Sequence, residues 1–292
     1  MNTKGIAFYL GLSYLLIALT TIVGVRQGYL TLVSPNLFQY LLLIAMMGVP
    51  ALSAFTARLV FPDDDEGLSL PVWPVPIAPA IAVTVAAPVL FGLSYTVAAL
   101  FGLTRPQWGL GSLLNRVKEQ LSAPLAPGVE SAAPVVALIA YPIISLLIGA
   151  TLFSFIALGS EMGWRGYLMP RLQPLGRTTA SLIAGLCWGL WFLPLVYAWH
   201  LEAEMPGAAG SMVRVVALGI ALSILLGAIV HKTGHLGLAA MALGAFAGQD
   251  SGIWGHLFEQ SSPPWTGTAG VINIVVWGIA GIAVLRWRSK KT

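Results

Sequence analysis

The sequence predicts an all-α integral membrane protein, a polytopic bundle of about eight transmembrane helices. Of its 292 residues, 57% are hydrophobic and only 9% are charged, whereas about a quarter of the residues in a soluble domain are charged. Long apolar runs recur along the chain, and about 20 consecutive apolar residues let one helix cross a bilayer. The single cysteine, Cys187, excludes an intrachain disulfide. We therefore expect a single integral membrane domain over residues 1–292.

Candidate membrane spans follow one another along the whole chain. They cover residues 6–25, 37–60, 77–101, 134–158, 179–199, 211–230, 235–250 and 267–285. The first apolar run is too long for a secretory signal peptide, and no cleavage site of small residues precedes Arg26, so a retained helix is predicted. The seventh span is short and rich in Gly and Ala, and it ends in Gln249 and Asp250.

The distribution of Lys and Arg predicts how these spans are oriented. With eight spans both termini lie on one side, and that side collects Lys4, Arg58, Arg165, Arg171, Arg177, Lys232, Arg286, Arg288, Lys290 and Lys291. The opposite side collects Arg26, Arg105, Arg116, Lys118 and Arg214. Because Lys and Arg are enriched in cytoplasmic loops, we expect a multi-pass protein of the cell membrane with both termini in the cytoplasm.

The charge pattern also bounds the classes of partner. The net charge of +4 fits topology and contact with membrane lipids. Nucleic-acid binding is not expected, because the chain has no basic stripe interleaved with aromatic residues and no soluble domain large enough to hold one.

Two loops are long enough to consider as sites. The acidic run "FPDDDEGLSLPVWP" (61–74) could ligate a hard cation, but it lacks the spaced ligands and glycine of a calcium loop, which favours a solvated loop. The loop 104–133 contains "WGLGSLLNRVKEQL", whose apolar residues recur at helical spacing. It predicts a short helix that lies either on the membrane surface or against the bundle.

A charged stretch, "SEMGWRGYLMPR" (160–171), interrupts the apolar sequence. Ser160 follows an apolar run, so it is predicted to cap a helix on the cytoplasmic side, with Glu161 in the first turn. Glu161 and Arg165 are one helical turn apart in the favourable order for an ion pair. A capped helix with an internal salt bridge would explain both charges. Ionisable groups at membrane depth are costly, however, and usually mark a cavity or pathway.

The surrounding sequence resembles the CAAX protease and bacteriocin-processing family (CPBP, also called Abi). "GSEMGWRGYLMPRL" (159–172) resembles its first motif, Glu-Glu-x-x-x-Arg. "WGLWFLPL" (188–195) resembles the second, Trp-Gly-Leu-Trp-His-Leu-Pro-Leu. "TGHLGLAAMALGAFAG" (233–248) resembles the third, an apolar helix with a His and then an Asn or Asp four residues on. The resemblance implies a CPBP-type bundle with a motif-bearing core at 134–250.

The resemblance also implies a reaction, because family members are glutamate-dependent, metal-associated intramembrane proteases. The second Glu and the Arg of the first motif match Glu161 and Arg165, which are therefore the surviving candidates for catalytic residues. The other motif positions are substituted. The first Glu falls on Ser160, the second-motif His on Phe192, the third-motif His on Gly244 and its partner on Gly248.

These substitutions predict a degenerate catalytic set. Peptide hydrolysis needs a positioned base, which contributes about 10²–10⁴-fold in rate. Ser160 has no His near it in sequence to activate it as a nucleophile. Phe192 is expected to fill the place of the water-activating His, and Gly244 and Gly248 form a small-xxx-small face for close helix packing.

The four histidines do not suggest a replacement site. His231 and His235 lie in "HKTGH", where Lys replaces the Glu of a zinc-protease helix and Thr-Gly should break the helix, so we expect them to be solvated loop residues. His200 and His256 are expected on the outer side. No metal ligand, cofactor-binding residue or cofactor is therefore predicted, and family-type metal dependence is not expected.

Three functions follow from these observations. The first is a catalytically degenerate CPBP-like protein that binds or scaffolds membrane proteins or lipids. The second is an active intramembrane endopeptidase of CAAX type with an altered site around Glu161 and Arg165, acting on a membrane protein or peptide substrate. The third, a small-solute transporter, is disfavoured because the chain shows no inverted repeat of Gly- or Pro-broken segments.

Overall fold

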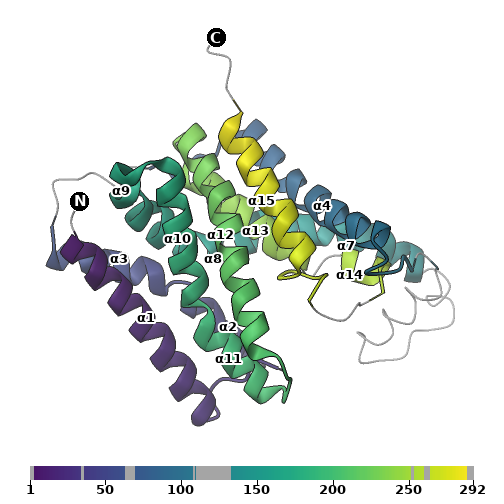
Figure 1. Cartoon of the computed structure of the whole chain (residues 1–292), viewed down its shortest axis with the longest axis horizontal. Coiled ribbons are helices and arrows are strands. Elements are labelled where there is room, and N and C mark those ends of the chain that lie inside the picture. The colour runs from purple at the N-terminus through teal and green to yellow at the C-terminus, as the bar shows by residue number, and fades with distance from the viewer. Residues whose placement is uncertain are drawn as a thin grey trace. The chain divides into compact units, whose positions relative to one another are not determined.

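The computed structural model describes residues 3–33, 36–62, 70–107, 109, 133–250, 253–259 and 264–287, and every regular element within them is a helix. The helices in chain order are α1 (Thr3–Arg26), α2 (Leu37–Met46), α3 (Val49–Val60), α4 (Ile77–Leu100), α7 (Ala133–Ile148), η1 (Gly149–Phe153), α8 (Ser154–Gly163), η2 (Trp164–Leu168), α9 (Met169–Leu172), η3 (Gln173–Leu175), α10 (Arg177–Trp191), α11 (Leu193–Glu202), α12 (Ala208–Thr233), α13 (Leu236–Asp250), α14 (Trp254–Leu257) and α15 (Val271–Arg286). Figure 1 labels most of them.

The expected polytopic all-α fold is confirmed. Six helical stretches of the described residues are long and apolar enough to cross a membrane: Thr3–Arg26, Leu37–Val60, Ile77–Leu100, Leu138–Leu175, Arg177–Glu202 and Ala208–Thr233. Two shorter apolar helices, Leu236–Gln249 and Val271–Arg286, match the remaining candidate spans. The protein is therefore a multi-pass membrane protein.

The second span has a break that the hydropathy pattern does not show. It divides into α2 and α3 at Met47 and Gly48, and Pro50 stands in the first turn of α3. Proline has no N–H to donate and fits the first turn of a helix, so a new helix begins here. Of the two loops considered as sites, residues 63–69, 108 and 110–132 lie outside the described residues, so those expectations stay predictions.

The chain forms two compact units. The first comprises Met1–Pro76, Phe155–Ala240 and Trp277–Thr292, and the second comprises Ile77–Ser154 and Met241–Val276. Helices α8, α13 and α15 each contribute residues to both units. The predictions of one domain over 1–292 and of a core at 134–250 stay predictions.

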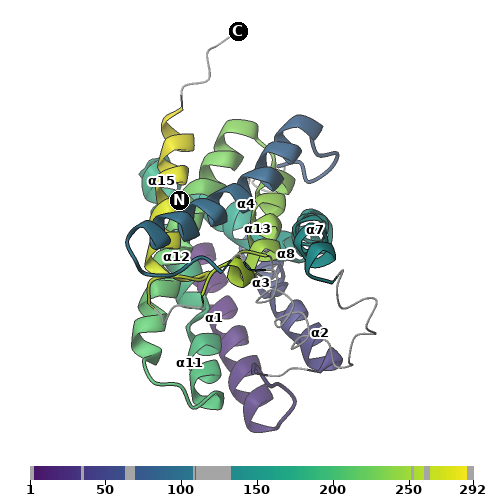
Figure 2. The ribbon, with the colours of Figure 1, turned by 90° about the vertical axis from the view of Figure 1, so that its right-hand side faces the viewer.

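In the first unit, α1 buries its more polar face. The buried positions recur every three or four residues and include Tyr9, Ser13 and Thr21, whereas exposed positions such as Leu15 and Leu19 are apolar. This pattern fits a helix whose outer face meets lipid, because lipid tails solvate apolar side chains and polar groups are costly in contact with them. Helix α1 packs against α3 and α11 (Figure 2).

Helices α10 and α12 pack closely against each other in the first unit (Figure 1). A Cβ atom added at Gly189 of α10 would lie 2.5 Å from the Cα of Val216, and one added at Gly185 would lie 2.7 Å from the Cα of Ile220. On α12, a Cβ at Gly219 would meet the carbonyl oxygen of Gly185 at 2.9 Å. These glycines let the two backbones touch, as small residues do at helix contacts in membranes.

In the second unit, α13 packs on the end of α7 and on η1 through small residues. A Cβ at Gly248 would lie 2.5 Å from the carbonyl oxygen of Ser145. The side chain of Gln249 then donates from Nε2 to the hydroxyl of Ser145 at 3.0 Å. Close backbone contact and an interhelical hydrogen bond together fix this pair, because each polar group buried in the bundle requires a partner.

Candidate functional site

The helix that carries Glu161 contains two π-helical turns. It runs from α7 through η1, α8 and η2 to α9 without leaving helical structure, and the π turns cover Gly149–Phe153 and Trp164–Leu168. Single π turns inside α-helices are frequent at functional sites, because the extra residue redirects the side chains on either side. Here η2 begins directly after α8, which holds Glu161, and it contains Arg165.

The expectation that Ser160 caps this helix is wrong. Ser160 lies inside α8, with its side chain buried and its hydroxyl without a hydrogen-bond partner. The helix does not end at Gly159. That glycine instead allows a close contact, since a Cβ there would lie 3.1 Å from the Cα of Gly48. The helix therefore continues, and its own carbonyl groups bond the N–H groups that a cap would satisfy.

The predicted ion pair between Glu161 and Arg165 is present. Nη1 of Arg165 donates to Oε1 of Glu161 at 2.7 Å, and both side chains are 0% exposed. The pair thus lies in the interior of the first unit rather than on a solvated helix face. A buried pair requires good geometry and further hydrogen bonds to offset its desolvation.

Aromatic rings from two other helices enclose the pair. The guanidinium carbon of Arg165 lies 4.6 Å from the centroid of the Trp188 ring on α10. From α1, the ring of Tyr9 packs on Trp164 at 5.6 Å between centroids and on Tyr167 at 4.9 Å. A cation over an aromatic face is attracted by the ring quadrupole, and most strongly when water is excluded. The Trp188 ring therefore stabilises the charge of Arg165.

Several polar atoms of this cluster have no partner. They are Oε2 of Glu161, Nε and Nη2 of Arg165, Oγ of Ser160, the indole nitrogens of Trp164 and Trp188, and the hydroxyl of Tyr9. Most buried polar groups in proteins are hydrogen-bonded. A concentration of unpaired ones in an apolar interior marks this cluster as the candidate site. The cluster also contains Tyr9, Trp164 and the ring of Trp188. In the sequence, their aromatic character was the only indication that these residues belong to the site.

Phe192 lies at the junction of α10 and α11. It is half-buried, and its ring packs edge-on against Trp191 at 5.0 Å between centroids and at a tilt against Trp188 at 6.0 Å. Trp191 in turn donates from its indole nitrogen to the carbonyl oxygen of Ser13 on α1. Phe192 therefore extends the aromatic cluster and brings no proton-transfer group to it.

Gly244 leaves no space for a side chain. A Cβ atom there would lie 2.6 Å from the carbonyl oxygen of Gly149 and would also meet the backbone nitrogen of Ser154. Real Cβ atoms do not approach backbone so closely, so any larger residue requires η1 or α13 to move. The expected close-packing face of Gly244 and Gly248 is thus present within the second unit.

Comparison with protein families identifies the segment that holds these residues. Residues 142–247 match the Rce1-like family model, described as type II CAAX prenyl endopeptidase Rce1-like. This segment is an Rce1-like domain, which is consistent with membership of the CPBP family. It includes Ser160, Glu161, Arg165, Phe192 and Gly244, and Gly248 follows directly after its end. A search of curated proteins found no match to the chain.

The residues at the CPBP motif positions do not fit the metal that the family implies. Among the described residues, no group of three or more His, Cys, Asp or Glu side chains could hold a metal ion. At the motif positions Glu161 supplies one carboxylate, while Phe192 and Gly244 supply no side-chain donor atoms. A protein metal site usually needs three or four such ligands, so these positions are too poor in donors to bind the ion.

His235 is not the solvated loop residue that the sequence suggested. Its side chain is buried, and Nε2 lies 2.9 Å from the carbonyl oxygen of Pro74, to which it can donate.

The helix break expected in "HKTGH" is present, because α12 ends at Thr233 and Gly234 adopts a left-handed conformation with φ of 64°. His231 belongs to the last turn of α12. His200 is buried in α11, with Nδ1 3.2 Å from the carbonyl oxygen of Met205.

Proposed function

We propose that this CPBP-family protein has lost peptide hydrolysis and acts by binding or scaffolding membrane proteins or lipids. The observation that carries the proposal is at Gly244, where the family's His is expected. The backbone of Gly149 and Ser154 takes up the space that any side chain would need. The change is therefore built into the helix packing and involves more than one side chain.

The state of Glu161 supports the same proposal. Its carboxylate is fully buried and held by Arg165, whereas a general base must reach the water that it activates. Its expected helper at the second motif is Phe192, which packs on two Trp rings. Glu161 and Arg165 then serve chiefly to join the helices of the first unit.

One observation favours the alternative, an active endopeptidase with an altered site. Oε2 of Glu161 and Oγ of the adjacent Ser160 are buried and have no partner. The carboxylate oxygen could accept a hydrogen bond from a water, and the hydroxyl could donate one to a peptide carbonyl. The substrate would be a membrane protein or peptide.

Purified protein incubated with prenylated CAAX peptides and with a library of membrane peptides distinguishes the two functions. We expect no cleavage, with or without added zinc, because residues that act as one catalytic unit fail together. The control is Glu161→Ala. Robust cleavage by the unaltered protein that disappears in this variant would favour the endopeptidase.

We further propose that the protein lies in the cell membrane with both termini in the cytoplasm. The asymmetry of Lys and Arg supports this orientation. Reporter domains fused to the C-terminus provide the test: green fluorescent protein should fluoresce there, and alkaline phosphatase, which needs export, should be inactive. The opposite result would reverse the orientation.

A further inference from the structure

A small groove lined by both apolar and basic residues lies in the first unit, apart from the residues around Glu161. Met169, Gly227 and Leu285 contribute apolar surface, and Gln173, Arg177 and His231 contribute polar groups. None of the described residues that line it is acidic. The groove therefore combines hydrocarbon surface with positive charge.

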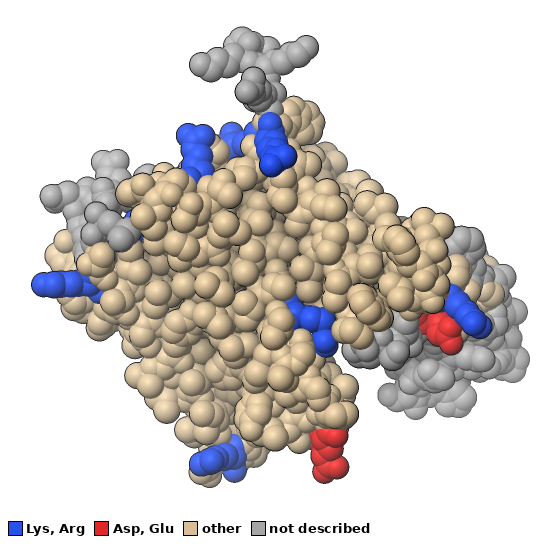
Figure 3. Space-filling view, in the orientation of Figure 1, with Lys and Arg blue, Asp and Glu red and all other residues tan. Residues whose placement is uncertain are grey.

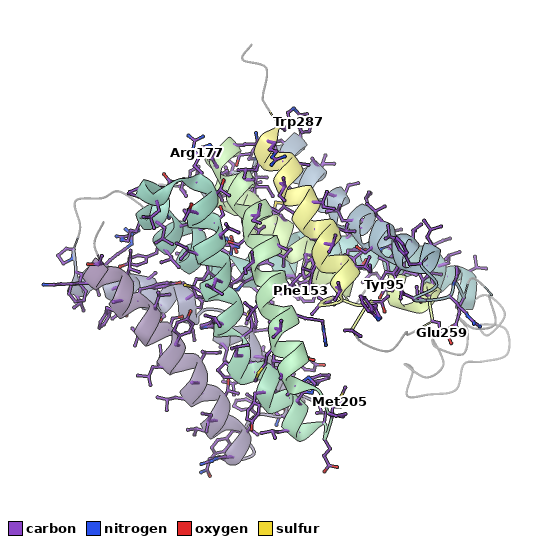
Figure 4. All side chains as sticks on the ribbon, viewed as in Figure 1. Tyr95, Phe153, Arg177, Met205, Glu259 and Trp287 are labelled. Atoms are coloured by element: carbon purple, nitrogen blue, oxygen red, sulfur yellow. The ribbon has the colours of Figure 1, made fainter. Side chains whose placement is uncertain are left out.

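Further cations lie beside this groove. Arg177 and Lys232 are both close enough to His231 to act on it electrostatically, and Lys232 donates from Nζ to the carbonyl oxygen of Trp287. Arg286 follows the groove residue Leu285 directly and is exposed. Lys and Arg side chains gather at this end of the unit (Figure 3), and Figure 4 shows Arg177 and Trp287 there.

The groove lies where α10 begins and where α12 and α15 end. Arg177 is the first residue of α10, His231 and Lys232 belong to the last turn of α12, and Leu285 belongs to the last turn of α15. Trp287, which follows α15, is 73% exposed. Trp is enriched at membrane interfaces, where its ring meets headgroups and the first methylene groups.

We propose that this groove binds an anionic phospholipid, with the headgroup phosphate at Arg177 and the upper acyl chain against Met169 and Leu285. A guanidinium pairs with two phosphate oxygens through parallel hydrogen bonds. Lys232 adds positive charge close by, and clustered basic residues at a helix end favour anionic lipids. The proposal does not depend on whether the protein hydrolyses peptides, because it uses none of the residues at the CPBP motif positions.

Thermal unfolding of the purified protein in a zwitterionic detergent tests this site. The unfolding temperature is followed during titration with short-chain phosphatidylglycerol and, separately, with phosphatidylcholine of the same chain length, because a lipid that binds only the folded state stabilises it. We expect phosphatidylglycerol to stabilise at much lower concentration. Arg177→Gln should raise its half-saturating concentration about fivefold, and Arg177→Gln with Lys232→Gln about 25-fold, at roughly one fivefold step per charge near a membrane surface.

The matched control is Arg26→Gln, which removes an exposed cation at the end of α1. We expect it to leave the half-saturating concentration unchanged. An equal shift in this control, or equal stabilisation by the two lipids, would contradict the proposal. Inorganic phosphate should neither stabilise the protein nor compete with the lipid; full competition would assign the site to a free anion instead.

A second measurement covers the case in which Arg177→Gln lowers stability without lipid. Native mass spectrometry then counts the phosphatidylglycerol molecules retained by each variant. We expect Arg177→Gln to retain fewer of these lipids than Arg26→Gln, and equal retention would overturn the proposed site.

Discussion

The guanidinium carbon of Arg165 lies 4.6 Å from the centre of the Trp188 ring, so the arginine has two partners on two different helices. Oε1 of Glu161, one helical turn earlier, lies 2.7 Å from Nη1 of Arg165. The Trp188 ring packs on the guanidinium from α10. Through these contacts the ion pair joins the motif-bearing helix to a neighbour. Changes at any of the three residues should therefore affect the stability of the first unit.

Removing either partner of the ion pair should destabilise the protein strongly. Glu161→Gln and Arg165→Met should each cost about 3–5 kcal/mol, because each leaves a buried charge without its partner. The double variant should lose less than the sum, since it removes both charges. Unfolding of detergent-purified protein measures the stability of the two single variants and the double variant. Strict additivity would mean that the two side chains do not interact.

The contact between Arg165 and Trp188 can be measured separately from the ion pair. Trp188→Phe weakens the ring face that meets the cation, so a cycle of Trp188→Phe with Arg165→Met should give a coupling free energy of about 1–2 kcal/mol. Trp199→Phe is the matched control, because Trp199 is 37% exposed and packs on His200 instead. Its cycle with Arg165→Met should show no coupling. The same coupling in both cycles would rule out a specific contact.

Sequence periodicity predicted the fold well, because a membrane span is a local property. The apolar runs located the long helices of the bundle, and the spacing of Glu161 and Arg165 predicted their hydrogen bond. The partners Trp188 and Tyr9 could not be predicted in this way. They come from other helices, and only packing decides which aromatic ring faces which cation.

Two local interpretations fail for a shared physical reason. The sequence predicts that Ser160 caps a helix and that His235 lies in solvent, because both residue types have those roles where water is available. In this chain Ser160 lies within a continuous helix and His235 is buried against Pro74. The glycine that precedes Ser160 marks a close backbone contact with Gly48 and not the end of a helix.

The glycines of α10 should be intolerant of even one methyl group. In Gly189→Ala the new Cβ would lie 2.5 Å from the Cα of Val216. Backbone cannot yield as a flexible side chain can, so we expect a loss of about 1–3 kcal/mol. Gly11→Ala on α1 is the control, because a Cβ there meets nothing within 4 Å. That change should be neutral or stabilising, since Ala favours a helix over Gly.

Unfolding of the detergent-purified variants measures this difference. If Gly189→Ala were as stable as Gly11→Ala, the close contact between α10 and α12 would be wrong.

Restoring the CPBP motif residues should not restore hydrolysis. Ser160→Glu with Phe192→His supplies the missing carboxylate and imidazole, and Gly244→His with Gly248→Asn completes the set. The last two changes meet the backbone of η1 and the carbonyl oxygen of Ser145, so the side chains can enter only if α13 moves away. We expect the quadruple variant, with all four substitutions, to unfold at lower temperature than the double variant Ser160→Glu with Phe192→His. We expect neither variant to cleave CAAX peptides. Turnover by the quadruple variant that is abolished by adding Glu161→Ala would contradict this expectation. It would mean that the backbone has kept its catalytic shape and that the loss of function lies in the side chains alone.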